Sequence, residues 1–212
     1  RLSATGSRVN PDHYMIVNRR REGPFAGIGR PIWSPESDRI AHVACVSPAV
    51  NQRPVSYLVI TGGEPGPAFK EVSTPKFSPC GKHVAYAAAN DEGQWRIVRD
   101  NQPGELLFSE LRARTITFSD NGRRLGYWAH RAGEGSYVVI DGKPYGPYRA
   151  PGKAGPGGSW ISTVIGEKIV FSPDGQRFAY IAGPVGKNGV RVFRDGKAGP
   201  LFDGIIGGPG FS

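Results

Sequence analysis

The chain has 212 residues, of which 38% are apolar, and a chain of this length can bury about 70% of its unfolded surface around one core. Its 31 Gly and 19 Pro predict frequent turns, and its net charge of +9 is dispersed rather than gathered in a tail. Two Cys, and no apolar run near about 18 residues, exclude a disulfide scaffold, a four-cysteine zinc site and a membrane-spanning helix.

The first signal along the chain is a repeated motif that begins with an aromatic residue and runs through a tight turn into a strand. Clear copies occupy residues 77–86, 118–127 and 171–180, and a looser copy occupies 33–42. The opening aromatics are separated by 44, 41, 53 and 40 residues, a period that predicts one structural unit per copy. Those aromatics are Trp33, Phe77, Phe118, Phe171 and Phe211.

Each unit continues with a second hairpin, in which two β-branched or aromatic runs flank turn glycines. The first strand of this hairpin begins at Tyr14, Tyr57, Trp95, Tyr137 and Val190. The returning strand follows Gly23-Pro24, Gly66-Pro67, Gly104, Gly146-Pro147 and Gly199-Pro200. Each unit therefore has four strands, which we name A (ending at the aromatic-Ser pair), B, C and D.

Four antiparallel strands and about 40 residues per unit are typical of a β-propeller blade. We predict an all-β fold, a five-bladed β-propeller of four-stranded antiparallel blades. The ring is expected to close by pairing of a C-terminal strand A (Gly210–Ser212) with the N-terminal strands B (Arg1–Ala4), C and D. Five blades cut from a larger propeller are the alternative. A single domain spans 1–212, with blades at 209–212 plus 1–28, 31–72, 75–113, 115–150 and 168–204, and a long inter-blade connection at 151–167.

The third residue of strand B is small in every unit. A small side chain in a strand lets a neighbouring sheet approach closely. We therefore expect this column to lie where two blades face each other, at positions Ala41, Ala85, Gly126 and Ala179.

The aromatic-Ser-Pro-Asp-Gly units, clearest at 171–175, resemble the WD-like repeat of TolB-type bacterial β-propellers, and the resemblance covers nearly the whole chain. It implies a rigid disc that binds proteins or other ligands, with no catalytic residue and no cofactor, often in the periplasm or outside the cell. The pattern departs from the family where residues 35–38 lack the turn glycine, where Cys80 replaces the turn Asp and where Asp120 replaces the proline.

Two sets of connections are expected on opposite faces of the disc. The A–B and C–D turns are short and repetitive, whereas the B–C and D–A connections vary, so ligands are expected on the second face. The connection 151–167 adds a large aromatic there, either as a ligand contact or folded back over the blade. The predicted ligand-binding residues are Arg53, His130, Arg131, Lys153 and Trp160.

Catalytic patterns are weak. No Asp or Glu lies in the predicted inner strands, at 31–33, 75–77, 115–118, 168–171 and 209–211, which argues against the carboxylate pair of a glycoside hydrolase. Asp141 and Asp174 are expected to be turn residues whose side chains bond nearby backbone.

Metal and disulfide patterns are weak as well. His42 and His83 fill blade columns otherwise held by Tyr and Arg, and His13 and His130 fall in loops of different blades, so no metal site is predicted. Cys45 ends a strand B and Cys80 lies in an A–B turn, on opposite faces, so no disulfide is expected.

Three functions follow. The preferred one is a non-catalytic binding or scaffold propeller that recognises a protein or glycan through the face of the B–C and D–A loops. The second is binding of nucleic acid or an acidic polysaccharide by the basic surface, with affinity that falls steeply with salt. The third, a five-bladed glycoside hydrolase, is disfavoured by the missing carboxylates.

Overall fold

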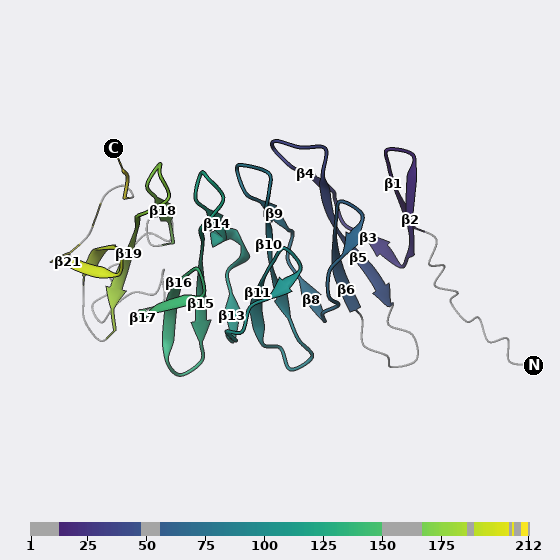
Figure 1. Ribbon diagram of the computed structural model, residues 1–212. Coiled ribbons are helices and arrows are strands. Elements are labelled where there is room, and N and C mark those ends of the chain that lie inside the picture. Colours follow the sequence, from purple (N-terminus) through teal and green to yellow (C-terminus); the bar gives the residue numbers. More distant parts are fainter. Residues whose placement is uncertain are drawn as a thin grey trace, which may run out of the picture.

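The computed structural model describes residues 13–47, 56–149, 167–185, 189–203, 205 and 209–211. Over these ranges the chain is all-β apart from one turn of 3-10 helix, and its antiparallel sheets stand side by side in a curved row (Figure 1). The row begins with a hairpin of β1 (His13–Val17) and β2 (Arg20–Phe25). The predicted antiparallel all-β architecture is confirmed.

The next two sheets have the predicted strand order A-B-C-D, with strand A in two short pieces. The second sheet contains β3 (Gly27–Ile28), β4 (Ile32–Trp33), β5 (Ile40–Ser47), β6 (Ser56–Thr61) and β7 (Glu64–Pro65). The third contains β8 (Glu71–Val72), β9 (Lys76–Phe77), β10 (Val84–Ala89), β11 (Trp95–Arg99) and β12 (Gln102–Pro103). Four-stranded sheets stacked in an arc are the arrangement of successive propeller blades, and we call them blades below.

The fourth and fifth blades repeat this order and are joined by pairing between β17 and β19. The fourth contains β13 (Glu110–Leu111), the 3-10 turn η1 (Ala113–Thr115), β14 (Thr117–Phe118), β15 (Leu125–Arg131), β16 (Gly135–Ile140) and β17 (Lys143–Arg149). The fifth contains β18 (Ile169–Phe171), β19 (Phe178–Pro184), β20 (Val190–Arg194) and β21 (Lys197–Phe202).

Strand A, which forms the inner edge of each blade, is longer than predicted and is interrupted near its middle. In the third blade β8 pairs with one end of β10 and β9 with the other. In the fifth blade, Arg149 and Ile169 both pair with β19, so residues 150–166 are inserted within strand A. Strand D of the fourth blade therefore continues directly into the first half of the next strand A, and the prediction of an inter-blade connection at 151–167 stays a prediction, since 151–166 lie outside the described residues.

The small column of strand B lies between blades, as predicted. Ala41 and Ala85 are fully buried, and Ala179 is buried in the fifth blade. A Cβ atom on Gly126 would lie 2.9 Å from Ile140 and 3.2 Å from Ile169 of the next blade. Large apolar side chains fill the remaining space between sheets, in clusters that include Trp128, Tyr180 and Phe118.

One arginine joint recurs between neighbouring blades. In each case the guanidinium lies over the aromatic ring that ends the next strand A, and it donates to the carbonyl of the residue that follows the next turn glycine. The three joints are Arg39 over Phe77 and to Lys82 O (3.0 Å), Arg99 over Phe118 and to Arg123 O (3.1 Å), and Arg124 over Phe171 and to Gln176 O (2.8 Å). The A–B turn of the third, fourth and fifth blades is thereby tied to the blade before it.

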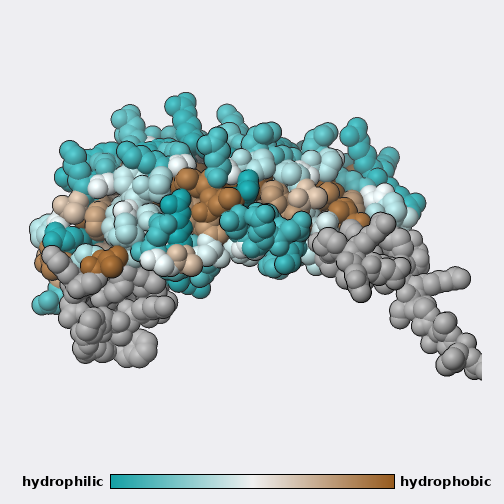
Figure 2. All heavy atoms as spheres, turned by 90° about the horizontal axis from the view of Figure 1, so that it is seen from below, coloured by the Kyte–Doolittle hydropathy of each residue, from teal (hydrophilic) through white to brown (hydrophobic). Residues whose placement is uncertain are grey.

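Closure of the ring is not confirmed. The hairpin β1–β2 and the strand β21 stand at opposite ends of the row (Figure 1), and Gly210 and Phe211 belong to no strand. The predicted N-terminal strand B lies outside the described residues. Viewed from the side of the B–C hairpins, the molecule is an arc with a hydrophilic convex edge (Figure 2).

Candidate functional site

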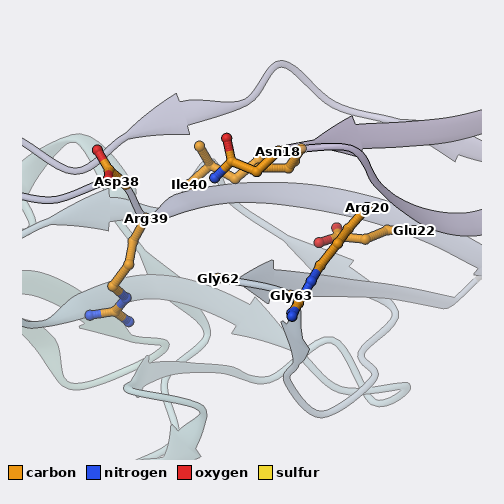
Figure 3. A pocket seen from close by; sticks show the side chains of 9 residues that line it. Asn18, Arg20, Glu22, Asp38, Arg39, Ile40, Gly62 and Gly63 are labelled. Atoms are coloured by element: carbon orange, nitrogen blue, oxygen red, sulfur yellow. The ribbon is translucent and has the colours of Figure 1, made fainter.

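A cavity of about 440 Å³ lies between the first hairpin and the second blade, on the face of the A–B and C–D turns. Arg39 and Asp38 stand at one end, Arg20 and Glu22 at the other, and Gly62 and Gly63 lie between them (Figure 3). The remaining lining residues are Val17, Asn18 and Ile40. A second cavity of about 310 Å³ adjoins it and shares Arg39 and Gly62.

The C–D turns of the last three blades hold a carboxylate in a fixed position. Each turn aspartate accepts a hydrogen bond from the first amide of strand B through Oδ1 and contacts the side chain of the residue before that amide through Oδ2. The amide contacts are Val84 to Asp100 (2.9 Å), Leu125 to Asp141 (2.8 Å) and Phe178 to Asp195 (2.9 Å). The side-chain contacts are His83 Nδ1 to Asp100 (2.7 Å), Arg124 Nε to Asp141 (2.7 Å) and Arg177 Nε to Asp195 (3.1 Å).

In the second blade, Gly62 takes the place of this aspartate. Its amide donates to Ile40 O at 2.8 Å, as the amide of Asp141 donates to Leu125 O at 2.9 Å. Its φ of +60° is close to the +49° of Asp141, so the two turns share one backbone conformation. Among the described residues of the second blade, no side chain therefore accepts a hydrogen bond from Ile40 N–H or Arg39 Nε.

Arg39 is fixed by the joint to the third blade, through Lys82 O at 3.0 Å and the Phe77 ring. Among the described residues, no carboxylate forms an ion pair with it. Arg124, its counterpart in the fourth blade, makes both the joint and an ion pair with Asp141. The cavity thus holds an ordered guanidinium whose Nε edge lacks an anionic partner.

The opposite end of the cavity is backed by a buried histidine. His42 is fully buried, and its Nε2 lies 3.6 Å from Glu22 Oε2. Burial lowers the pKa of His42, and the carboxylate of Glu22 opposes this shift. Neither ring nitrogen has a hydrogen-bond partner in the described residues. His42 fills the column of Tyr86, as predicted, and it packs against Phe25 of the first hairpin.

A second polar cluster lies at the interrupted inner strands of the fourth and fifth blades. Glu167, with a side chain only 8% exposed, accepts hydrogen bonds from Arg112 and Arg114. Arg112 also contacts Glu110, at 3.4 Å. Since strand A is longer than predicted, it includes Glu71 and Glu110, with Glu167 at its border. The prediction of inner strands without acidic residues is wrong, although Glu110 and Glu167 are paired with arginines.

Only two of the five predicted ligand-binding residues lie within the described part of the chain. His130 Nδ1 lies 3.3 Å from Ser136 Oγ of the paired strand. Arg131 covers the rings of Phe108 and Tyr137 and lies 3.6 Å from Glu134. The contacts with Ser136, Tyr137 and Glu134 are local to the B–C hairpin, whereas Phe108 pairs with Trp95 of the third blade. Arg53, Lys153 and Trp160 lie outside the described residues, and the role of all five stays a prediction.

The turn aspartates have the structural role that the sequence predicts. Asp174 Oδ1 accepts hydrogen bonds from Ser172 Oγ and from the Gln176 amide, and the Ser172 bond is the first cause of the lowered pKa of Asp174. Cys80 replaces this aspartate in the third blade, and its Sγ lies 3.3 Å from Ser78 Oγ. Cys80 forms no disulfide.

The described ranges contain no group of three His, Cys, Asp or Glu side chains arranged to hold a metal ion. Within the same ranges, no helix is long and apolar enough to cross a membrane.

The cavity was not predicted from the sequence, because the aligned motif covers the A–B turns and not the C–D turns. An alignment of the C–D turns would have shown Gly62 against Asp100, Asp141 and Asp195.

Comparison with solved structures finds β-propeller proteins among those similar to this chain. The β-propeller domain of the Trilobed protease from Pyrococcus furiosus is 14% identical over 84% of this chain and 58% of that chain, with a TM-score of 0.45. TolB from Acinetobacter baumannii is 18% identical over 81% of this chain and 42% of its own, with a TM-score of 0.37. An oligogalacturonate lyase in complex with manganese is 12% identical over 79% and 48% of the two chains, with a TM-score of 0.39.

The chain therefore spans less than two thirds of the length of each of these three structures. No protein-family model and no curated protein sequence matches it.

Proposed function

We propose that this chain is a non-catalytic binding module of the β-propeller type, which recognises a protein or glycan partner. The observation that carries the proposal is the insertion of residues 150–166 into an inner strand whose two halves, ending at Arg149 and resuming at Ile169, both stay paired with β19. A segment attached at both ends to a rigid sheet is a common way to present a binding surface. We also propose five blades and a ring closed by the two chain ends.

The ionisable groups of the described residues support a binding role over a catalytic one. Asp141, Asp174 and Asp195 accept hydrogen bonds from backbone amides, and Glu167 accepts them from two arginines. None of these carboxylates is left to act as a general acid or base. Arg99 and Arg124 are held in joints between blades and paired with Asp100 and Asp141, which reduces the positive charge that they offer to a polyanion.

The proposal is tested with Trp160→Ala, because a large aromatic is the strongest anchor in the inserted segment. Binding is measured on a glycan array and by cross-linking to extract proteins, with thermal unfolding as the folding check. Trp33→Ala is the matched control, since Trp33 is 63% exposed and belongs to the second blade, whereas the inserted segment leaves and re-enters the fifth.

We expect Trp160→Ala to lose at least tenfold in binding with an unchanged melting temperature, and Trp33→Ala to bind normally. A melting temperature lower by several degrees in Trp160→Ala would place that residue in the core and contradict its binding role. Binding to heparin or nucleic acid that falls by tenfold or more between about 50 and 200 mM salt would favour the polyanion function instead.

A further inference from the structure

We propose that the cavity between the first hairpin and the second blade binds a ligand carboxylate, which occupies the position that the turn aspartate fills in the last three blades. Arg39 Nε and Ile40 N–H are the two donors, and Gly62 is the residue that leaves the position open. This site lies on the face of the A–B and C–D turns, so it is independent of the partner surface proposed above.

The donors are placed for a carboxylate by the architecture of the repeat. In the fourth blade the equivalent pair, Leu125 N–H and Arg124 Nε, holds Asp141 at 2.8 and 2.7 Å. Backbone at Gly62 follows the same path, and a Cβ atom there would lie 3.7 Å from Arg39 Nε, an ordinary contact distance. An amide and a guanidinium that need no rearrangement form strong, charge-assisted hydrogen bonds to one carboxylate.

The cavity has room for more than the carboxylate itself. Its volume of about 440 Å³ falls within the range of about 300–1,000 Å³ that is typical of small-molecule sites. Val17 and Ile40 supply apolar walls, and Asn18 supplies an amide. If the ligand carboxylate is bound at Arg39, the rest of the ligand, which must be compact and polar, would extend toward Arg20 and Glu22 (Figure 3).

The charges around the cavity limit the charge that the rest of the ligand can have. Asp38 stands at the same end as Arg39, and Glu22 at the same end as Arg20 (Figure 3), so a ligand with several negative charges would meet a carboxylate at both ends. A ligand with one carboxylate and a neutral remainder fits the charges best. A uronic acid and the free C-terminus of a peptide share this chemistry.

The test follows the Ile40 amide by two-dimensional ¹H–¹⁵N NMR while one carboxylate at a time is added to the whole chain. The probes are acetate, D-glucuronate and N-acetylglycine, with sodium chloride and methyl glucuronate, the uncharged ester, as controls. We expect a saturable shift of the Ile40 amide and the Arg39 Nε–H with the carboxylates alone. Stronger binding of glucuronate or of N-acetylglycine than of acetate identifies a sugar acid or a peptide terminus as the source.

Gly62→Asp is the decisive variant, because it restores the protein's own carboxylate. It should abolish the response to every probe and raise the melting temperature. Gly62→Asn accepts from the Ile40 amide without a charge and should weaken binding at least tenfold, which keeps the test open if the Asp variant fails to fold. An Ile40 response that never saturates, that appears equally with chloride, or that persists in both variants would overturn the proposal.

Discussion

Glu167 accepts a bidentate pair of hydrogen bonds from Arg114, at 2.9 Å each, although 53 positions separate the two residues. Arg114 belongs to the 3-10 turn that interrupts the inner strand of the fourth blade, and Glu167 stands at the end of the inserted segment. The contact therefore fastens the base of the insertion to the neighbouring blade.

Glu167→Gln should lower the free energy of unfolding by about 1–3 kcal/mol, because it removes a charge that two arginines share in a largely buried place. Chemical denaturation measures the change. Glu110→Gln is the matched control, since Glu110 is 58% exposed and contacts Arg112 at 3.4 Å, so its effect should stay below about 0.5 kcal/mol. Equal effects of the two substitutions would contradict the fastening role.

The hydroxyls of Tyr148 and Tyr180 meet at 2.7 Å between the fourth and fifth blades, in a buried position. Tyr180→Phe leaves the other hydroxyl without a partner and should cost about 1–2 kcal/mol of unfolding free energy. The double variant Tyr148→Phe/Tyr180→Phe should cost less than the sum of the two single variants, as measured in a double-mutant cycle. Strict additivity would show that the hydrogen bond contributes nothing.

Burial depresses the pKa of His42 below its ordinary value of 6.5, so the folded chain binds the proton less readily than the unfolded chain. Protonation then favours unfolding, and stability should fall as pH drops from about 6.5 toward the lower folded-state pKa. Melting temperatures at pH 7.0 and 5.0 measure this loss.

His42→Tyr, which installs the residue that Tyr86 and Tyr127 provide in their blades, should show a smaller decrease over the same interval. A decrease of the same size in the variant would assign the pH dependence to other groups.

Ala85 lies in the small column between the third and fourth blades and is fully buried. Ala85→Leu should therefore destabilise the chain by about 1–3 kcal/mol through overpacking. Ala198→Leu is the control, because Ala198 is exposed on the outer strand β21 and should change stability by less than about 0.5 kcal/mol. A tolerated leucine at position 85 would mean that the blades can separate there.

Much of the fold follows from the sequence because the turn chemistry repeats. In the A–B turns of the fourth and fifth blades the serine makes the same short contact, Ser119 with Asn121 and Ser172 with Asp174, so aligned residues have equivalent structures. The buried column from Ala41 to Ala179 follows from the same alignment.

The divided inner strand could not be predicted, since its pieces are only two or three residues long and carry no periodic signal. For this reason the sequence does not predict Glu110 and Glu167 at the inner edge. The open carboxylate position at Gly62 can be found from the sequence only when it is known that the aspartates of other C–D turns accept a hydrogen bond from the first amide of strand B.

The arginine joints between blades have main-chain carbonyls as their acceptors, at Lys82, Arg123 and Gln176. A carbonyl is present whatever the side chain, so mutations at these acceptor positions leave the joint intact, while loss of the donor arginine breaks it. The side chains of the turn that accepts the hydrogen bond can therefore vary among repeats without weakening the contact between blades. The chemistry of that turn surface can change while the arrangement of the blades stays the same.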